Sequence, residues 1–288
     1  MTDPLNDAPP DLARVSNELR ARVVRMSHEA SCPHLGSALS CMDLLTVLYG
    51  HAARVTPATA DDPARDRVVL SKGHAAPALY AVLERYGFID AAVLERFNTD
   101  GAELAEQPSP GCVPGIEAAT GSLGHGLPIA AGLALGAKIQ KTGARVYAVL
   151  SDGECNEGST WEAAMTASAS AFGLHNLCVL VDYNRWQATG RSDEVLHLQD
   201  LAAKWAAFGW QTQTLDGHDV PALIAALDRF AEAEPGDAPT AFVCDTVKGR
   251  GVSFMEDDNN WHYRIPTADE VESAAAELLG VEGVAADA

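Results

Sequence analysis

The sequence predicts an α/β fold in which a parallel sheet carries helices on both faces. Two segments, Arg145–Leu150 (RVYAVL) and Leu177–Asp182 (LCVLVD), are apolar and β-branched without polar alternation, which is typical of strands buried on both faces. Segments of this kind alternate with helical periodicities along the chain. Strands that alternate with helices indicate right-handed βαβ crossovers and a parallel sheet.

The composition is that of a packed globular protein. Of the 288 residues, 47% are hydrophobic and 21% are charged, which excludes a disordered or fibrous chain. The 40 acidic residues outnumber the 20 Lys and Arg residues and give a net charge of −20, so binding to nucleic acid or to an anionic membrane surface is disfavoured. A local cationic pocket or a metal ion still permits a phosphorylated ligand.

The cysteine pattern and the start of the chain indicate a reducing compartment. None of the six cysteines forms a CxxC pair, and the first ten residues are rich in Asp and Pro, unlike a signal peptide. No run approaches the roughly 18 consecutive apolar residues that a membrane-spanning helix needs. We therefore expect a cytoplasmic protein with unpaired, mostly buried thiols.

The chain divides into a flexible leader (residues 1–10), one domain (11–267) and a helical tail (268–288). The first helix follows the leader, because apolar residues recur every three or four positions from Leu12 to Met26. Short apolar runs predict strands at 67–71, 145–150, 177–182, 210–215 and 240–245. Helical patterns predict helices at 39–49, 77–86, 127–140, 159–172, 198–208 and 220–233. Segments rich in Gly, Pro or Asp predict loops at 54–66 and 98–121.

Polar clusters follow four of the predicted strands, where an open parallel sheet binds its ligands. They are Ser71–His74, Ser151–Glu157, Asp182–Gln187 and the segment after Asp245.

Within these clusters, Asp152 and Asn184 end consecutive strands and lie 32 residues apart (184 − 152), about the length of a βαβ unit. An Asp carboxylate, an Asn carbonyl and a main-chain carbonyl form an all-oxygen set that suits Mg²⁺ or Ca²⁺, with a ligand diphosphate completing the coordination. Gly153 and the helix start after it would admit that diphosphate. The alternative is that Asp-Gly and Tyr-Asn here are ordinary turn sequences.

Several short blocks resemble the N-terminal part of transketolases. Ser151-Asp152-Gly153-Glu154 with the distant Asn184 resembles the thiamine diphosphate motif, and the other blocks appear in the family's order across residues 16–267. These blocks are His34–Ser37 (HLGS), Leu70–Ala75 (LSKGHA), Gly121–Gly126 (GSLGHG), Glu157-Gly158, Trp161–Ala164 (WEAA) and Trp261-His262. The resemblance implies the thiamine-diphosphate-binding fold and identifies the chain as similar to the N-terminal subunit of a split transketolase.

The resemblance also implies a role for individual residues. The divalent ion would be held by Asp152, Asn184 and the backbone carbonyl of Trp186. Thiamine diphosphate would be contacted by His74, Gly121, Leu123, Gly153, Glu157, Asn184 and His262. The reacting carbonyl and hydroxyls of the substrate would meet His34, His74 and His262, imidazoles that move protons near neutral pH. Glu157 and Glu162 would join an acidic network at a dimer interface.

The implied assembly contains more than this chain. Family members activate the cofactor with a Glu in a pyrimidine-binding domain, which we expect on a separate C-terminal subunit. A second copy of this chain would complete a heterotetramer, because an apolar face without these partners would be exposed. The expected reaction is transfer of a two-carbon ketol unit between sugar phosphates or sugar-like molecules.

The sequence departs from the family pattern at two positions, and two alternative functions stay open. Ser151 replaces a Gly of the motif, and Gln107 stands where the family has a His that contacts the donor sugar. Gln cannot shuttle a proton at neutral pH, so the donor or its first step is open. Lys72 is expected either to meet a phosphate or to be solvated. The alternatives are the α-subunit of a thiamine-dependent keto-acid decarboxylase or dehydrogenase, and a non-catalytic paralogue.

Overall fold

The computed structural model describes residues 11–280, which form a five-stranded, fully parallel sheet in the order β1-β2-β3-β5-β4. This confirms the α/β class. All five predicted strands are present. Their bounds are β1 Arg67–Leu70, β2 Val146–Ser151, β3 Leu177–Tyr183, β4 Gln211–Asp216 and β5 Thr240–Asp245.

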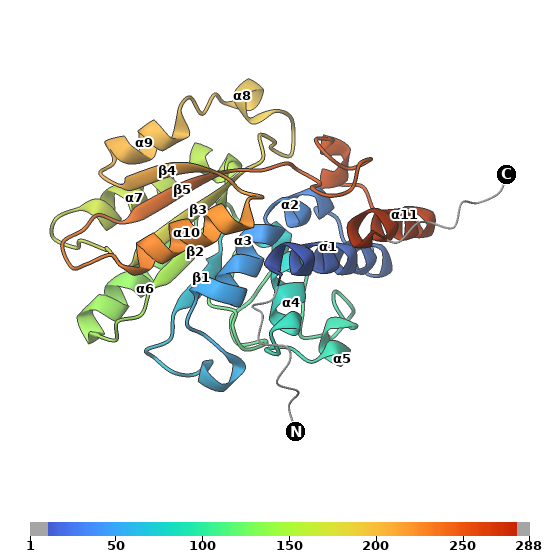
Figure 1. Ribbon diagram of the computed structural model, residues 1–288, viewed down its shortest axis with the longest axis horizontal. Helices are drawn as coiled ribbons and strands as arrows, with labels where there is room; N and C mark the ends of the chain where they lie inside the picture. Colours follow the sequence, from blue (N-terminus) through green and yellow to red (C-terminus); the bar gives the residue numbers. More distant parts are fainter. Residues whose placement is uncertain (1–10, 281–288) are drawn as a thin grey trace.

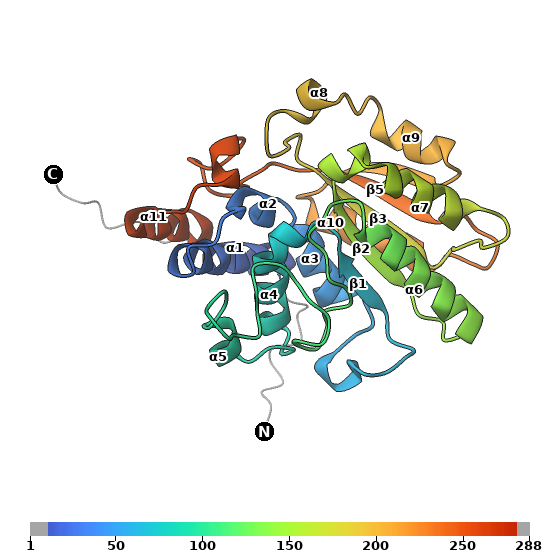
Figure 2. The same cartoon turned by 180° about the vertical axis from the view of Figure 1, so that it is seen from behind.

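Helices cover both faces of the sheet (Figure 1). On one face lie α1, α3, α4 and α10, and on the other α6, α7 and α9, which Figure 2 brings to the front. The helices are α1 Leu12–Glu29, α2 Leu35–Ser40, α3 Met42–Val47, α4 Ala76–Arg85, α5 Ala91–Leu94, α6 Gly126–Gln140, α7 Gly158–Ser168, α8 Ser192–Val195, α9 Leu201–Ala207, α10 Val220–Ala231 and α11 Ala268–Leu279.

Alternate residues of each strand enter two different cores. Tyr147 and Val149 of β2 pack among α1, α3 and α10, whereas Val146, Ala148 and Leu150 pack among α6, α7 and α9. All five are fully buried. The period of two along a strand therefore explains why β2 contains no polar alternation: both of its faces are inside.

The predicted helix 39–49 is wrong in detail. The structure interrupts it at Cys41, so that Leu35–Ser40 and Met42–Val47 are separate helices, and a π-helical turn follows at Leu48–Ala52. At the interruption the Ser40 hydroxyl donates to Asp182 at 2.6 Å. The break therefore coincides with a contact to a residue 142 positions away, which no local periodicity reveals.

Two other boundaries also differ from the prediction. Helix α7 ends at Ser168 rather than at 172, because Ala169 is extended (φ −58°, ψ 134°). Helix α9 begins three residues later than expected, since the Asp200 side chain caps it by accepting from Ala203 N at 2.9 Å. Such local hydrogen bonds compete with helix extension.

The ends of the described chain lie close to the first helix. The helix expected after Thr267 is α11, whose Thr267 and Glu270 form a reciprocal capping box. It packs along α1 and buries Val271, Ala274 and Leu278 in the same core. The leader expected at residues 1–10 lies outside the described residues.

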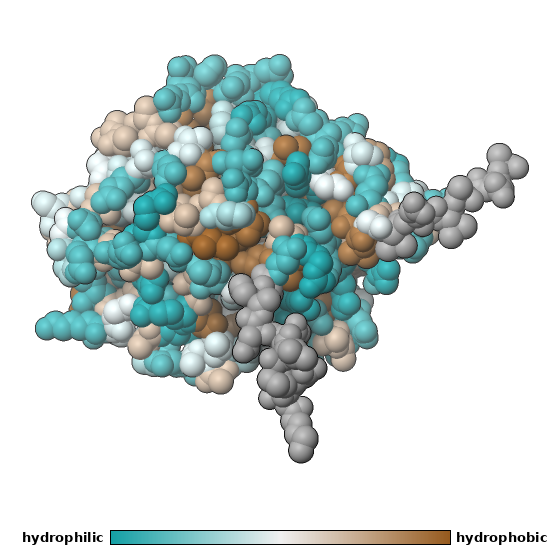
Figure 3. Space-filling model, viewed as in Figure 1, coloured by the Kyte–Doolittle hydropathy of each residue, from teal (hydrophilic) through white to brown (hydrophobic). Residues whose placement is uncertain are grey.

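The surface is largely polar on the face that the first view presents. Figure 3 shows a mostly hydrophilic face with small apolar patches. Within residues 11–280, no helix has both the length and the apolar character required to cross a bilayer.

Candidate active site

The predicted polar clusters follow four of the five strands and lie together at the carboxyl ends of those strands. Strands β1, β2, β3 and β5 are neighbours in that order, and Ser151 pairs with Asp182 across β2 and β3. Asp152 therefore leaves the sheet next to the last residues of β3, and the Asp152 amide donates to the Asp182 carbonyl at 3.3 Å. The carboxyl ends of these strands form the floor of the candidate active site.

A buried ion pair lies below these strand ends and joins three of the four clusters, those after β1, β3 and β5. The Lys72 ammonium donates to the Asp182 carboxylate, and both side chains are 0% exposed. Asp182 also accepts from Ser40, Asn184 and Thr246. Burial opposes ionisation of both partners, but their attraction lowers the pKa of Asp182 and raises that of Lys72.

Lys72 therefore fits neither of its two sequence-based interpretations. It is not solvated, because it is fully buried. It is not free to meet a phosphate, because its ammonium group also donates to the Ser37 carbonyl at 2.9 Å. Its partner Asp182 lies 110 positions away along the chain, so sequence reasoning had no local signal for the pair.

Two of the three predicted cation ligands, Asn184 and Trp186, lie in the short loop after β3, and the third, Asp152, contacts the end of that loop through Ser192. Asp152 is 0% exposed and accepts from Gly153 N at 2.9 Å and from Ser192 Oγ at 2.7 Å. Asn184 Oδ1 accepts from Trp186 N at 3.0 Å. The Trp186 carbonyl accepts no hydrogen bond from the described residues.

These residues fit a hard divalent cation. Asp152 takes part in none of the ion pairs formed by residues 11–280, and burial raises its pKa to about 7. A cation beside it would compensate that buried charge. No group of three His, Cys, Asp or Glu side chains in the described chain is placed to hold a metal, so a cation at Asp152 would depend on amide and carbonyl oxygens as well.

The three predicted catalytic histidines converge. The ring centroid of His34 lies 5.4 Å from that of His74 and 4.8 Å from that of His262, and the His74 and His262 centroids are 5.8 Å apart. His34 has a left-handed backbone (φ 70°) at the start of α2, and its amide donates to the His262 carbonyl at 2.9 Å. Three imidazoles from three distant segments therefore share one space.

All three imidazoles are held neutral. Burial is the main cause, and it lowers the pKa of His262 to about 3, that of His74 well below its ordinary value, and that of His34. The Lys248 ammonium lies 3.3 Å from His262 Nδ1 and donates to Asn259 Oδ1 at 2.7 Å. Because Nδ1 faces a donor, Nε2 carries the ring proton of His262.

Lys248 is a site residue that sequence reasoning missed. It is fully buried, and burial followed by repulsion from Lys72 lowers its pKa to about 8. The available signal was a Lys-Gly-Arg-Gly sequence directly after the last strand. Glu106 was missed as well, and its Oε1 lies 3.4 Å from His34 Nδ1.

The loop 120–126 lies tightly over the turn after β1. A Cβ at Gly73 would meet the Thr120 carbonyl oxygen at 1.9 Å, and one at Gly126 would meet Ser71 Oγ at 2.2 Å. Glu154 ties the two segments together, because it accepts from Ser71 Oγ and from Gly124 N. This packing brings the glycine-rich loop beside the turn that carries His74.

The remaining predicted contacts lie along the same loop. Gly121 and Leu123 are half-buried, Glu157 is exposed at the start of α7, and a Cβ at Gly124 would meet Glu157 Cβ at 2.7 Å. The Gln107 side chain covers Gly121, since a Cβ there would lie 1.9 Å from Gln107 Oε1. The residue that departs from the family pattern therefore lies against a predicted cofactor contact.

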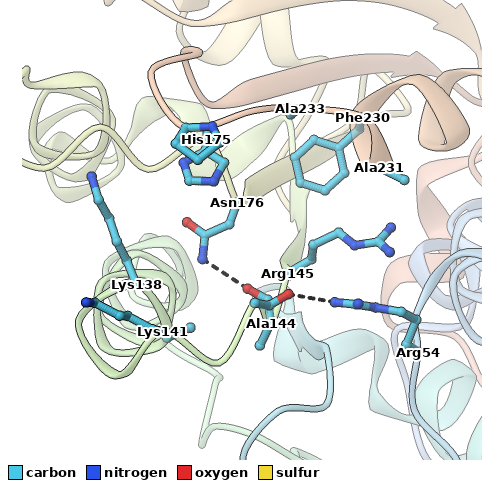
Figure 4. A pocket seen from close by; sticks show the side chains of 13 residues that line it. Arg54, Lys138, Lys141, Ala144, Arg145, His175, Asn176, Phe230, Ala231 and Ala233 are labelled. Atoms are coloured by element: carbon cyan, nitrogen blue, oxygen red, sulfur yellow. Dashed lines mark hydrogen bonds between the residues drawn. The ribbon is translucent and has the colours of Figure 1, made fainter.

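A cavity of about 440 Å³ at the amino ends of the strands is remote from these residues (Figure 4). It is lined by Arg54, Lys138, Lys141 and Arg145, but the basic groups do not converge. Arg54 and Arg145 both contact the buried Asp66, and Lys138 donates to main-chain carbonyls. We therefore do not place the active site in this cavity.

Known proteins share this sequence and this architecture. The family described as "Transketolase, thiamine diphosphate binding domain" matches residues 12–285. One subunit of the apulose-4-phosphate transketolase of Phocaeicola vulgatus is 38% identical over 91% of this chain and 92% of its own length. One subunit of the 6-deoxy-6-sulfo-D-fructose transketolase of a Clostridium species is 35% identical over 93% of this chain and 96% of its own length.

Solved transketolases have the same fold. The transketolase of Pichia stipitis in complex with sedoheptulose 7-phosphate aligns with a TM-score of 0.86 and 26% identity over 93% of this chain. The chain covers 41% of that protein's length. The sequence, the sheet order and the converging polar clusters agree with these matches, and the chain therefore belongs to the transketolase family of transferases, in which it corresponds to the N-terminal, thiamine diphosphate binding subunit.

Proposed function

We propose that the chain is one component of a two-component transketolase that transfers a two-carbon ketol unit between sugars or sugar-like molecules with thiamine diphosphate and Mg²⁺. The observation that carries the proposal is the position of a buried, uncompensated Asp152 at the same sheet edge as three converging neutral imidazoles. Thiamine diphosphate supplies a nucleophilic carbon and an electron sink when it is bound.

The chain's own residues have three tasks. Asp152, Asn184 Oδ1 and the Trp186 carbonyl would hold Mg²⁺, and Gly153 would let the diphosphate approach the backbone. His262 donates from Nε2 to a developing oxyanion, while the neutral His34 and His74 accept and return hydroxyl protons. Lys248 places a positive charge next to this group, which favours negative charge in the substrate.

The substrate class follows from the relatives and the site. The two most informative relatives are named for a ketose phosphate and a sulfonated ketose. We infer that this chain acts on a ketose with an anionic end, which the positive charge of the buried Lys248 beside His262 would favour. A carboxamide at Gln107 can donate to a donor hydroxyl without transferring a proton.

A partner chain and a second copy of this chain are part of the proposal. Helices α6 and α7 run side by side (Figure 2) and border an apolar groove of about 520 Å³. Ile129 and Met165 are exposed beside it, and Glu162 lines it. An exposed apolar groove is typical of an interface. Relatives of similar length are named as single subunits of a transketolase, which supports a partner that supplies the activating Glu. With six free cysteines, we place the assembly in the cytoplasm.

The test is reconstitution. The chain is purified with the candidate pyrimidine-domain partner, and ketol transfer is followed with and without thiamine diphosphate and Mg²⁺. We expect two-carbon transfer that needs both chains. Cleavage of α-keto acids alone would support the dehydrogenase alternative, and a complex that binds no cofactor would support the non-catalytic paralogue.

A further inference from the structure

We propose that Asp257 is a positioning residue that locks the loop 184–192 onto the segment 246–262 and so couples the cation ligands to His262. The inference rests on the proposed function, which assigns cation ligands to the loop 184–192 and a catalytic histidine to the segment 246–262. The lock itself consists of contacts that can be tested without any cofactor.

The loop 184–192 is a small hairpin that contains two of the candidate cation ligands, Asn184 and Trp186. Trp186 and Arg191 pair as an antiparallel bridge. At one end Asn184 Oδ1 accepts from Trp186 N, and at the other end Ser192 Oγ donates to Asp152 Oδ2 at 2.7 Å. Any displacement of the hairpin therefore displaces oxygen atoms that would hold the cation.

Asp257, in the segment 246–262, binds two side chains of this hairpin. Its carboxylate accepts from Trp186 Nε1 at 2.8 Å and from both terminal nitrogens of Arg191 at 2.6 Å. The Arg191 guanidinium also lies 3.8 Å from the centre of the Trp186 ring. Bidentate contacts of this kind fix orientation as well as position.

The backbone of Asp257 is itself held in place. Its φ is +58°, a left-handed conformation that Asp and Asn tolerate better than most residues. Its amide donates to the Lys248 carbonyl at 2.8 Å. Such a conformation persists where surrounding contacts determine it.

A second contact runs in parallel and reaches the histidine. Asn259 Nδ2 donates to the Ala188 carbonyl of the hairpin at 3.1 Å, and Asn259 Oδ1 accepts from Lys248 Nζ at 2.7 Å. Lys248 Nζ lies 3.3 Å from His262 Nδ1. Asp257 and Asn259 thus connect the hairpin, through two short series of hydrogen bonds, to Lys248 and from there to His262.

The chain provides a matched control in the same loop. Arg185 contacts Asp245 at 2.7 Å, and these side chains are 49% and 42% exposed. The Arg191–Asp257 pair is similarly exposed, at 35% and 56%. The control pair connects the hairpin to the end of β5 and not to the segment that carries His262.

The test compares amide hydrogen exchange in the full chain for wild type, Asp257→Asn, Arg191→Gln, the double variant and the control Asp245→Asn. Asn suits the left-handed backbone, so the fold is retained, which thermal melting verifies. We expect faster exchange in both 186–191 and 257–262 for each single variant, with no further increase in the double variant. Faster exchange confined to 254–258, or an equal effect of Asp245→Asn on 257–262, would overturn the proposal.

A second measurement uses calorimetry, in which thiamine diphosphate and Mg²⁺ are titrated into the complex of this chain with its pyrimidine-domain partner. We expect Asp257→Asn to weaken binding about tenfold, as changes behind metal ligands commonly do, and Asp245→Asn to weaken it less, because its partner Arg185 does not connect the hairpin to the segment that carries His262. Unchanged affinity in Asp257→Asn would also overturn the coupling. If the wild type binds no cofactor, the proposed function fails, while the exchange data decide the lock independently.

Discussion

Lys72 and Asp182 form a fully buried ion pair that connects the ends of β1 and β3. Hydroxyls of Ser40 and Thr246 complete the hydrogen bonds of the carboxylate. The pair thereby binds α2 and the segment after β5 to the centre of the sheet. It lies below the candidate active site and determines where each polar cluster emerges.

Replacing one member of this pair should be costly. Asp182→Asn leaves the Lys72 charge buried without a counter-charge, and we expect the free energy of unfolding to fall by about 3–5 kcal/mol. Denaturant unfolding measures it. The control is Glu18→Ala, which removes the half-buried partner of two exposed arginines, Arg14 and Arg85, and should cost less than about 1 kcal/mol. Equal effects of the two substitutions would contradict a central role for the pair.

Asp152→Asn should separate folding from cofactor binding. Burial raises the pKa of Asp152 to about 7, above the roughly 3.9 of an unfolded Asp, so the folded chain binds more protons between these values. The metal-free wild type therefore loses stability as the pH rises from about 4 to 7.

In the variant this loss should disappear, because Asn does not titrate. Its Oδ1 still accepts from Gly153 N, and its Nδ2 faces Ser192 Oγ, which can accept instead of donate. We expect the variant to be more stable than metal-free wild type at pH 8 by about 2–4 kcal/mol, and Mg²⁺ to stabilise only the wild type. Calorimetric melts with and without Mg²⁺ decide this. Equal stabilisation of both proteins by Mg²⁺ would place the cation elsewhere.

A second buried carboxylate should make the fold sensitive to acid. Burial alone would raise the pKa of Asp43, but Arg20 and then His218 hold it at about 2. Its folded pKa lies below its unfolded value, so its contribution is present above about pH 4 and is lost as the pH falls towards 2. The free energy of unfolding, measured across this pH range, should show the loss. In Asp43→Asn the free energy of unfolding should depend less on pH.

His262→Ala should remove a hydrogen bond to the developing oxyanion without unfolding the chain. We expect kcat of the reconstituted enzyme to fall about 10²- to 10³-fold, with cofactor affinity reduced much less. The control is His51→Ala, whose imidazole is exposed and pairs with Asp228 remote from the site. A loss of cofactor binding that matches the loss of rate would assign His262 to binding alone.

The sequence was sufficient for those parts of the site that depend on strand ends. Asp152 and Asn184 could be paired because each follows a continuous apolar run, and parallel neighbours end at the same edge. The Lys72–Asp182 ion pair could not be predicted from the sequence, since it depends on which strands are adjacent in the sheet. Lys248 and Glu106 lie in irregular segments without periodicity. The break at Cys41 coincides with a hydrogen bond from Ser40 to the distant Asp182, which a local helical pattern does not encode.

The groove between α6 and α7 has a practical consequence for anyone who handles this protein. With Met165 about half exposed beside it, a preparation concentrated in isolation should self-associate and precipitate, and its measured properties will vary with protein concentration. Co-expression with the cognate chain is therefore the sound starting point for crystallisation or enzymology.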